Sequence, residues 1–168
     1  MDAIFTRRSI RSFQAREVEP HKVEKLLKAA MQAPSAGNQQ PWEFLVIQKR
    51  NTLKQLAGMS PYAGPIGRAA LAIVVLGNTE RMRFAENWQQ DLGAATENIL
   101  LEAVAQGLGG VWLGVHPASE RVEAICTQFS LPQNCKPFAV VALGYPQEEN
   151  ANHFVDRYLP DRVHYESY

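Results

Sequence analysis

The feature that most constrains the fold of this chain is an unbroken apolar segment at residues 69–76, with the sequence AALAIVVL. The segment is rich in β-branched residues and has no alternating polar positions, which is typical of a strand covered on both faces. It is much shorter than the roughly 20 apolar residues that cross a bilayer, and no other run is longer. We therefore expect a central strand of a sheet.

Helical and extended patterns surround this segment. Residues 2–7 are expected to form one or two helical turns. Pro20 opens a helix with an apolar stripe that ends near Ala33, and Asn51 is the predicted N-cap of a short helix. Further helices are predicted at 88–106 and 119–129, and further strands at 42–47, within 107–115 and at 138–143. The aromatic tail at 150–168 is predicted to pack as an arm on the same subunit or a partner.

Composition restricts the class of protein. A length of 168 residues predicts a single domain, residues 1–168, and 46% hydrophobic residues support a real core. The 17 basic and 17 acidic residues balance, which argues against a nucleic-acid or anionic membrane surface. The first residues are in the wrong order for a secretory signal, so we expect a cytoplasmic protein. Cys126 and Cys135 have no partners at zinc-type spacing, so no metal is expected.

Residues 33–42 (APSAGNQQPW) form a loop with the composition of a binding site. Pro34 and Pro41 restrict its backbone at both ends, and Gly37 permits a positive φ or a close approach. The polar side chains between them offer amide and hydroxyl groups to an anionic ligand. The alternative is a rigid turn between a helix and a strand.

Residues 7–11 (RRSIR) carry three arginines. If the chain is extended from Ser9, Ser9 and Arg11 point to one side and Ile10 to the other. A guanidinium beside a hydroxyl suits a phosphate or a heterocycle carbonyl, whereas the alternative is a solvated basic patch.

Several common catalytic patterns are missing from the sequence. The four histidines, His21, His116, His153 and His164, are scattered, and there is no Gly-x-Ser-x-Gly motif. The glycines at 107–110 fail the dinucleotide-binding fingerprint, because Trp112 stands at the third glycine position and they follow a helix. Anion-binding loops without an obvious acid, base or nucleophile indicate that a cofactor performs the chemistry.

Five segments, in order, resemble the FMN-dependent nitroreductase family, and the resemblance covers nearly the whole chain. They are residues 7–11, 33–42, 91–103 (DLGAATENILLEA), 107–114 (GLGGVWLG) and 141–146 (VALGYP). The resemblance implies an α+β fold with a mixed, mostly antiparallel sheet flanked by helices. It also implies an intertwined homodimer with two FMN sites at the interface and a C-terminal arm, residues 150–168, that reaches over the partner.

The resemblance also implies roles for individual residues. Arg7, Ser9 and Arg11 would meet the flavin phosphate, ribityl chain and pyrimidine edge, with Arg8 close by. Arg11 would have the catalytic role, because a cation beside the pyrimidine edge favours the charge that reduction leaves there.

Other positions follow by the same resemblance. Four loop residues from the other subunit would hold the flavin, and the backbone of a later segment would face flavin N5. The loop residues are Pro34, Ser35, Ala36 and Asn38, and the backbone segment is Trp112, Leu113 and Gly114. Arg162, preferred over Arg157, would supply a second phosphate contact. Phe84 and Trp88 would either stack beside the flavin or belong to the core.

The implied activity is hydride transfer from NAD(P)H, through flavin N5, to an electron acceptor such as a nitroaromatic compound or a quinone, in two half-reactions. A flavin carrier or redox sensor with little turnover is one alternative. A flavin-fragmenting or dehalogenating enzyme on the same fold is another. The sequence leaves the acceptor and the choice between NADH and NADPH open.

Overall fold

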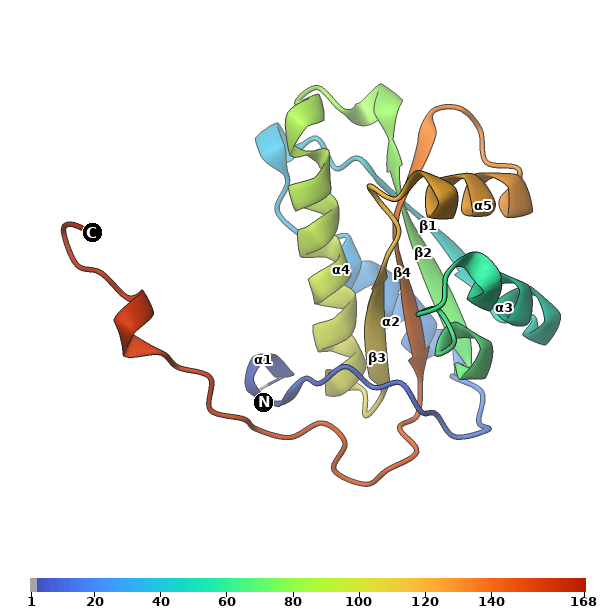
Figure 1. Ribbon diagram of the computed structural model, residues 1–168, viewed down its shortest axis with the longest axis horizontal. Coiled ribbons are helices and arrows are strands. Elements are labelled where there is room, and N and C mark those ends of the chain that lie inside the picture. The colour runs from blue at the N-terminus through green and yellow to red at the C-terminus, as the bar shows by residue number, and fades with distance from the viewer. Residues whose placement is uncertain (1–2) are drawn as a thin grey trace.

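The computed structural model describes residues 3–168 and is built around one antiparallel sheet (Figure 1). Its strands are β1 (Trp42–Ile47), β2 (Leu71–Asn78), β3 (Gly109–Gly114) and β4 (Cys135–Gly144), in the spatial order β1-β2-β4-β3. All three strand pairings are antiparallel, and the isolated bridge from Ser9 to Gly110 is parallel. The predicted α+β fold with a mostly antiparallel sheet is confirmed.

Strand β2 is central, as its apolar sequence predicts. It pairs with β1 on one side and β4 on the other, and every residue in it is buried. Because side chains alternate along a strand, Leu71, Ile73 and Val75 enter one core while Ala72 and Val74 enter the other. Because both faces of this strand are buried, every position along it favours an apolar side chain, which explains the unbroken apolar run.

Helices cover both faces of the sheet. On the face of Ile73 lie α2 (Pro20–Ala30) and the long α4 (Trp88–Ala105), whose apolar residues join the same core. The opposite face is covered by α3 (Arg50–Leu56) and α5 (Ser119–Phe129). The short α1 (Ala3–Thr6) lies beside α4. Short 3-10 turns complete the structure at η1 (Ala36–Asn38), η2 (Ala57–Met59), η3 (Ile66–Arg68), η4 (Thr79–Arg81), η5 (Ala85–Asn87) and η6 (Pro160–Arg162).

Some predicted boundaries are wrong. Lys49, not Asn51, is the N-cap of α3, and Asn51 lies inside the helix. Strand β2 begins at Leu71 because the N–H of Ala69 still donates to Pro65 and Ile66 in the preceding turn. Helix α2 ends at Ala30, followed by a turn, and β4 begins earlier than predicted. Of the predicted N-terminal helix, Asp2 lies outside the described residues.

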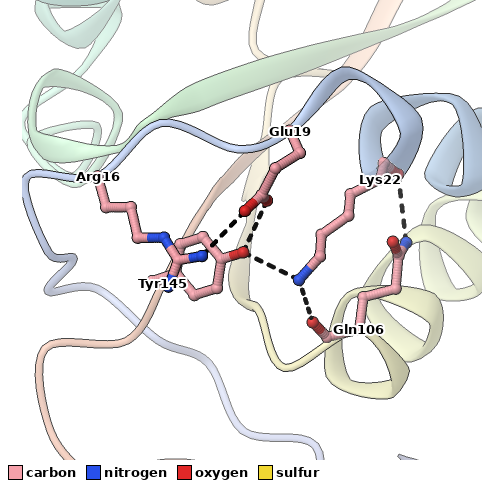
Figure 2. A network of polar contacts seen from close by, with 5 residues as sticks. All are labelled: Arg16, Glu19, Lys22, Gln106 and Tyr145. Atoms are coloured by element: carbon pink, nitrogen blue, oxygen red, sulfur yellow. Dashed lines mark hydrogen bonds and ion pairs between the residues drawn. The ribbon is translucent and has the colours of Figure 1, made fainter.

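A polar network fastens the N-terminal segment to the body (Figure 2). The Tyr145 hydroxyl donates to one oxygen of the Glu19 carboxylate at 2.7 Å, and Arg16 pairs with the other oxygen at 2.9 Å. Lys22 donates to the Tyr145 hydroxyl and to the Gln106 carbonyl. The Tyr145 hydrogen bond, the Glu19 backbone and Arg16 together lower the pKa of Glu19 to about 2. The network thus joins the start of α2, the end of α4 and the end of β4.

The C-terminal segment leaves the body as an extended arm with one short turn, η6 (Figure 1). From residue 153 onward every residue is exposed, including Phe154, Tyr158, Tyr165 and Tyr168. Exposed aromatic residues in this number are typical of a surface that another molecule covers. The helices among residues 3–168 lack the length and apolar character that a bilayer span requires.

Candidate functional site

The arginine segment runs along the outer side of strand β3. The N–H of Ile10 donates to the Gly110 carbonyl at 2.9 Å, and Ser9 forms the bridge to Gly110. Ile10 is buried against Gly109, where a Cβ would lie 2.7 Å from Ile10 Cγ1. Ser9 and Arg11, on either side of Ile10, are exposed, as the predicted alternation requires. The contact between Ile10 and Gly109 therefore sets the position of both polar side chains.

The first cavity beside this segment has a volume of about 570 Å³ and is rich in charge. Arg8, Ser9, Arg11 and Arg157 line it, and Glu148 and Glu149 lie at the same cavity. Its size falls in the range of small-molecule sites, roughly 300–1,000 Å³. Three guanidinium groups around one cavity make it suitable for an anion such as a phosphate.

Arg8 combines side-chain hydrogen bonds to two backbone carbonyls with one buried donor that has no partner in the described part of the chain. Its Nη2 donates to the Phe5 carbonyl at 3.1 Å, but its buried Nε has no hydrogen-bond partner among the described residues. Burial, and then the neighbouring charges of Arg157 and Arg7, lower the pKa of Arg8. An anion in the cavity would relieve this repulsion between positive charges. The backbone is held by Asn152, whose Oδ1 accepts from the Arg8 N–H at 3.1 Å.

Arg7 has a different environment. Its Nε forms an ion pair with Glu97 of α4 at 3.0 Å, and Arg7 is not a lining residue of the first cavity. The structure thus separates the predicted cluster, because Arg8 and Arg11 face the cavity while Arg7 is paired with α4.

A second cavity of about 580 Å³ shares Arg11 with the first. Its other lining residues include Tyr62, Arg68 and the segment Trp112, Leu113 and Gly114. Among the described residues that line it, two are arginines and none is acidic. The structure therefore brings together Arg11 and the predicted β3 segment.

Strand β3 lies at the edge of the sheet, with β4 on one side only. The Gly110 carbonyl faces outward, toward Ile10. Because hydrogen-bonding direction alternates along an antiparallel strand, the backbone groups of Trp112 and Gly114 also face outward. The outward carbonyl of Gly114 accepts from Arg121 at 2.9 Å. The Trp112 and Gly114 N–H groups thus point to the open edge of the sheet, where a ligand can accept from them.

The loop at 33–42 lies elsewhere in the protomer, beside the N-terminal end of α4, whereas the arginine segment passes the C-terminal end (Figure 1). The Ala36 N–H donates to Asp91 of α4 at 2.9 Å. Asn38 is exposed, Ser35 is half-buried and Pro34 is exposed. Within one protomer the structure does not bring the loop to either cavity of Arg11.

The remaining predicted positions separate clearly. Arg162 lies in η6 on the exposed arm, whereas Arg157 lines the first cavity. Within this chain, the preferred Arg162 is therefore not among the residues that line that cavity. Trp88 is 7% exposed and packs edge-on against Phe138 and His116, which places it in the core. Phe84 is 43% exposed and belongs to the surface.

Sequence reasoning missed three residues that organise these sites: Arg68, Asn152 and Asp91. Arg68 and Asn152 stand in segments without periodic pattern, so no local signal marks them. Asp91 is different, because an acidic residue on the buried stripe of a helix must have a polar partner. The sequence therefore indicates that Asp91 has a polar partner, but it does not show which residue that partner is.

Comparison with known proteins identifies the family. The model of the nitroreductase family matches residues 4–64 and 60–145. An Archaeoglobus fulgidus protein called "Putative NADH dehydrogenase/NAD(P)H nitroreductase" is 44% identical over 98% of this chain and 96% of its own length. A solved structure of a "Putative NADH Oxidase" from Clostridium acetobutylicum is 51% identical, with a TM-score of 0.97 over 99% of this chain and 100% of its own. An "FMN-dependent Nitroreductase" structure from Clostridium difficile is 29% identical, with a TM-score of 0.89 over 100% of both chains.

The fold, an antiparallel sheet with helices on both faces, is shared with these solved structures, one of which is named an FMN-dependent nitroreductase. The chain belongs to the nitroreductase family.

Proposed function

We propose that this chain binds FMN, forms a homodimer, and transfers electrons from NAD(P)H to a small acceptor such as a nitroaromatic compound or a quinone. Bound FMN supplies the redox chemistry, which is the uptake of a hydride from NAD(P)H at N5 and its delivery to the acceptor. The names of the relatives support NAD(P)H as the donor, and the FMN-dependent neighbour supports the cofactor.

The observation that carries the proposal is that Arg11 lines two cavities of different character. The first, with Arg8 and Arg157, suits the phosphate of FMN, and the second suits its ring system. A phosphate there would offset the mutual repulsion of the Arg8 and Arg157 charges. The residues present therefore fit a ligand with an anionic end and a planar, hydrogen-bonding end.

Arg11 and the edge of β3 have complementary tasks in this proposal. The guanidinium of Arg11 holds a permanent positive charge where reduction of the ring leaves negative charge. The outward N–H groups of Trp112 and Gly114 offer hydrogen bonds that orient the ring from the strand edge. Hydride transfer needs no side-chain acid, in agreement with the lack of a carboxylate among the described residues that line the second cavity.

The absence of the loop residues from the lining of both Arg11 cavities supports the proposed dimer. Because the loop at 33–42 does not line the cavities of its own protomer, we infer that Pro34, Ser35, Ala36 and Asn38 serve the FMN of the partner. The exposed aromatic arm is the second element that a partner would cover.

The test is an absorbance spectrum of the purified protein with added FMN, followed by anaerobic titration with NADH and with NADPH. We expect the protein to bind FMN and either nucleotide to bleach the flavin absorbance. We then expect steady-state turnover with ping-pong kinetics on a panel of nitroaromatic compounds and quinones. Tight FMN binding with almost no turnover would instead favour a carrier or sensor. The absence of FMN binding would refute the proposal.

A further inference from the structure

The loop at 33–42 is connected to helix α4 by a buried carboxylate. Asp91 is 4% exposed and lies in the first turn of α4. Its Oδ1 accepts from the Ala36 N–H at 2.9 Å, and its Oδ2 accepts from Gln39 Nε2 at 2.6 Å. Both oxygens are therefore directed at the loop.

Gln39 extends this connection to Phe84. Its Nε2 also donates to the Phe84 carbonyl at 3.2 Å, and its Oε1 accepts from the Phe84 N–H at 2.9 Å. The amide orientation is fixed, since both partners of Nε2 are acceptors. At 8% exposed, Gln39 is a buried polar side chain with every amide hydrogen used. One side chain thus joins α4, the loop and residue 84.

The loop backbone held in this way is a strained one. Gly37, Asn38 and Gln40 all have positive φ, at 51°, 54° and 48°. The Gly37 carbonyl accepts from Arg83 at 2.6 Å, and a Cβ at Gly37 would lie 2.3 Å from the Phe84 ring. Non-glycine residues reach this region only at a free-energy cost, so surrounding contacts must maintain it. Among these contacts, the hydrogen bond between Gln39 and Asp91 is buried.

The direction of these bonds argues against a purely helical role for Asp91. An acidic side chain in the first turn of a helix usually stabilises the free N–H groups of that helix. Here the carboxylate bonds to a different segment, while the N-cap residue Asn87 makes no side-chain capping bond. The buried carboxylate therefore serves the loop.

We propose that Asp91 is a positioning residue, which acts through Gln39 to fix the loop that holds the flavin and to couple that loop to Phe84. The inference rests on the proposed function, because the loop is assigned to FMN there. It adds a residue that does not touch the flavin and yet sets its affinity.

The test compares the dimeric wild-type protein with Asp91→Asn, Gln39→Glu and the double variant, using FMN fluorescence quenching for Kd and thermal unfolding of the flavin-free protein. Asp91→Asn places an NH₂ group against Gln39 Nε2, and Gln39→Glu places two carboxylates together. Each single change should raise the FMN Kd by roughly 10- to 100-fold, the range for a lost hydrogen bond to a charged group. The double variant restores a donor opposite an acceptor at position 91, although the new carboxylate still faces the Phe84 carbonyl, so its Kd should lie below that of Gln39→Glu.

Glu86→Gln is the matched control, because Glu86 is an exposed acid just before α4 that makes no hydrogen bond or ion pair with the loop in the described part of the chain. It should leave Kd unchanged. If Asp91→Asn does not fold, Gln39→Met removes the same link and should raise Kd by roughly tenfold.

The outcomes separate the two proposals. A wild-type protein that binds no FMN would overturn the proposed function. A wild-type protein that binds FMN, with Asp91→Asn binding it equally well, would overturn only the positioning role. A double variant whose loss on a logarithmic scale is the sum of the single losses would also overturn it, since the two residues would then act independently.

Discussion

The contact between Ile10 and Gly109 gives the sharpest test of how the arginine segment is positioned. In Gly109→Ala, the new methyl group would lie 2.7 Å from Ile10 Cγ1, 2.8 Å from Cβ and 2.9 Å from Cγ2. These distances are shorter than van der Waals contact, and one of the atoms is the Cβ, which moves only with the backbone. A change of rotamer at Ile10 is therefore not enough, and residues 9–11 must move away from β3.

The size of the effect follows from the packing. Overfilling a packed site costs about 1–3 kcal/mol, and for a chain of this length each kcal/mol lowers Tm by about 2–4 °C. We expect Gly109→Ala to lower Tm by roughly 2–12 °C. Ser9 and Arg11 flank the displaced residue, so FMN affinity should fall by roughly tenfold if the equivalent of one hydrogen bond is lost.

The assay is thermal unfolding of the flavin-free protein together with an FMN titration. Gly58→Ala is the control, because Gly58 is exposed and a Cβ there would meet nothing within 4 Å. It should leave both Tm and Kd close to those of the wild type. Gly109→Ala with an unchanged Tm and an unchanged Kd would refute the argument that this contact sets the arginine segment.

Three further predictions concern single side chains. Arg11→Ala should slow flavin reduction by NADH, measured in stopped flow, much more than it weakens FMN binding; equal loss of both would contradict its catalytic role. The pKa of Glu19 is lowered from 4.5 to about 2, so its stabilising effect is present above pH 4.5 and lost as the pH falls toward 2. In urea unfolding, Glu19→Gln should therefore be less stable than the wild type at pH 7, and the gap should close by pH 2; a constant gap would contradict this. Burial and then Glu43 raise the pKa of Cys135, so at pH 8 a thiol reagent should label the half-buried Cys126 first, as mass spectrometry of the modified protein would show.

The sequence predicted most of the fold because its signals are local. The strand Trp42–Ile47 and the helix Ser119–Phe129 have the predicted boundaries. The central strand followed from an apolar run that serves two cores at once. Boundaries failed where a neighbouring turn decided them, as at Ala69, whose N–H is held by residues 65 and 66. Such hydrogen bonds leave no periodic pattern in the sequence.

The candidate site was only partly predictable. The family resemblance pointed to Arg7, Ser9 and Arg11, with Arg8 close by, and alternation around Ile10 predicted that Ser9 and Arg11 share a side. The sequence did not reveal that Arg7 is paired with Glu97, because that contact joins residues 90 positions apart. The resemblance favoured Arg162 over Arg157, whereas in this chain Arg157 lines the first cavity, because the path of the arm decides which arginine lies there.

By itself, the sequence determined the secondary structure, the two-faced central strand and the family, since each depends on residues close together in the chain or on motifs in a fixed order. The tertiary structure decided which charges are paired and which are free. It also placed the loop at 33–42 away from the arginines of its own protomer and fixed it to Asp91. Contacts of this kind depend on packing between distant segments, where a shift of a few ångströms changes the partner of a side chain, and no local pattern records them.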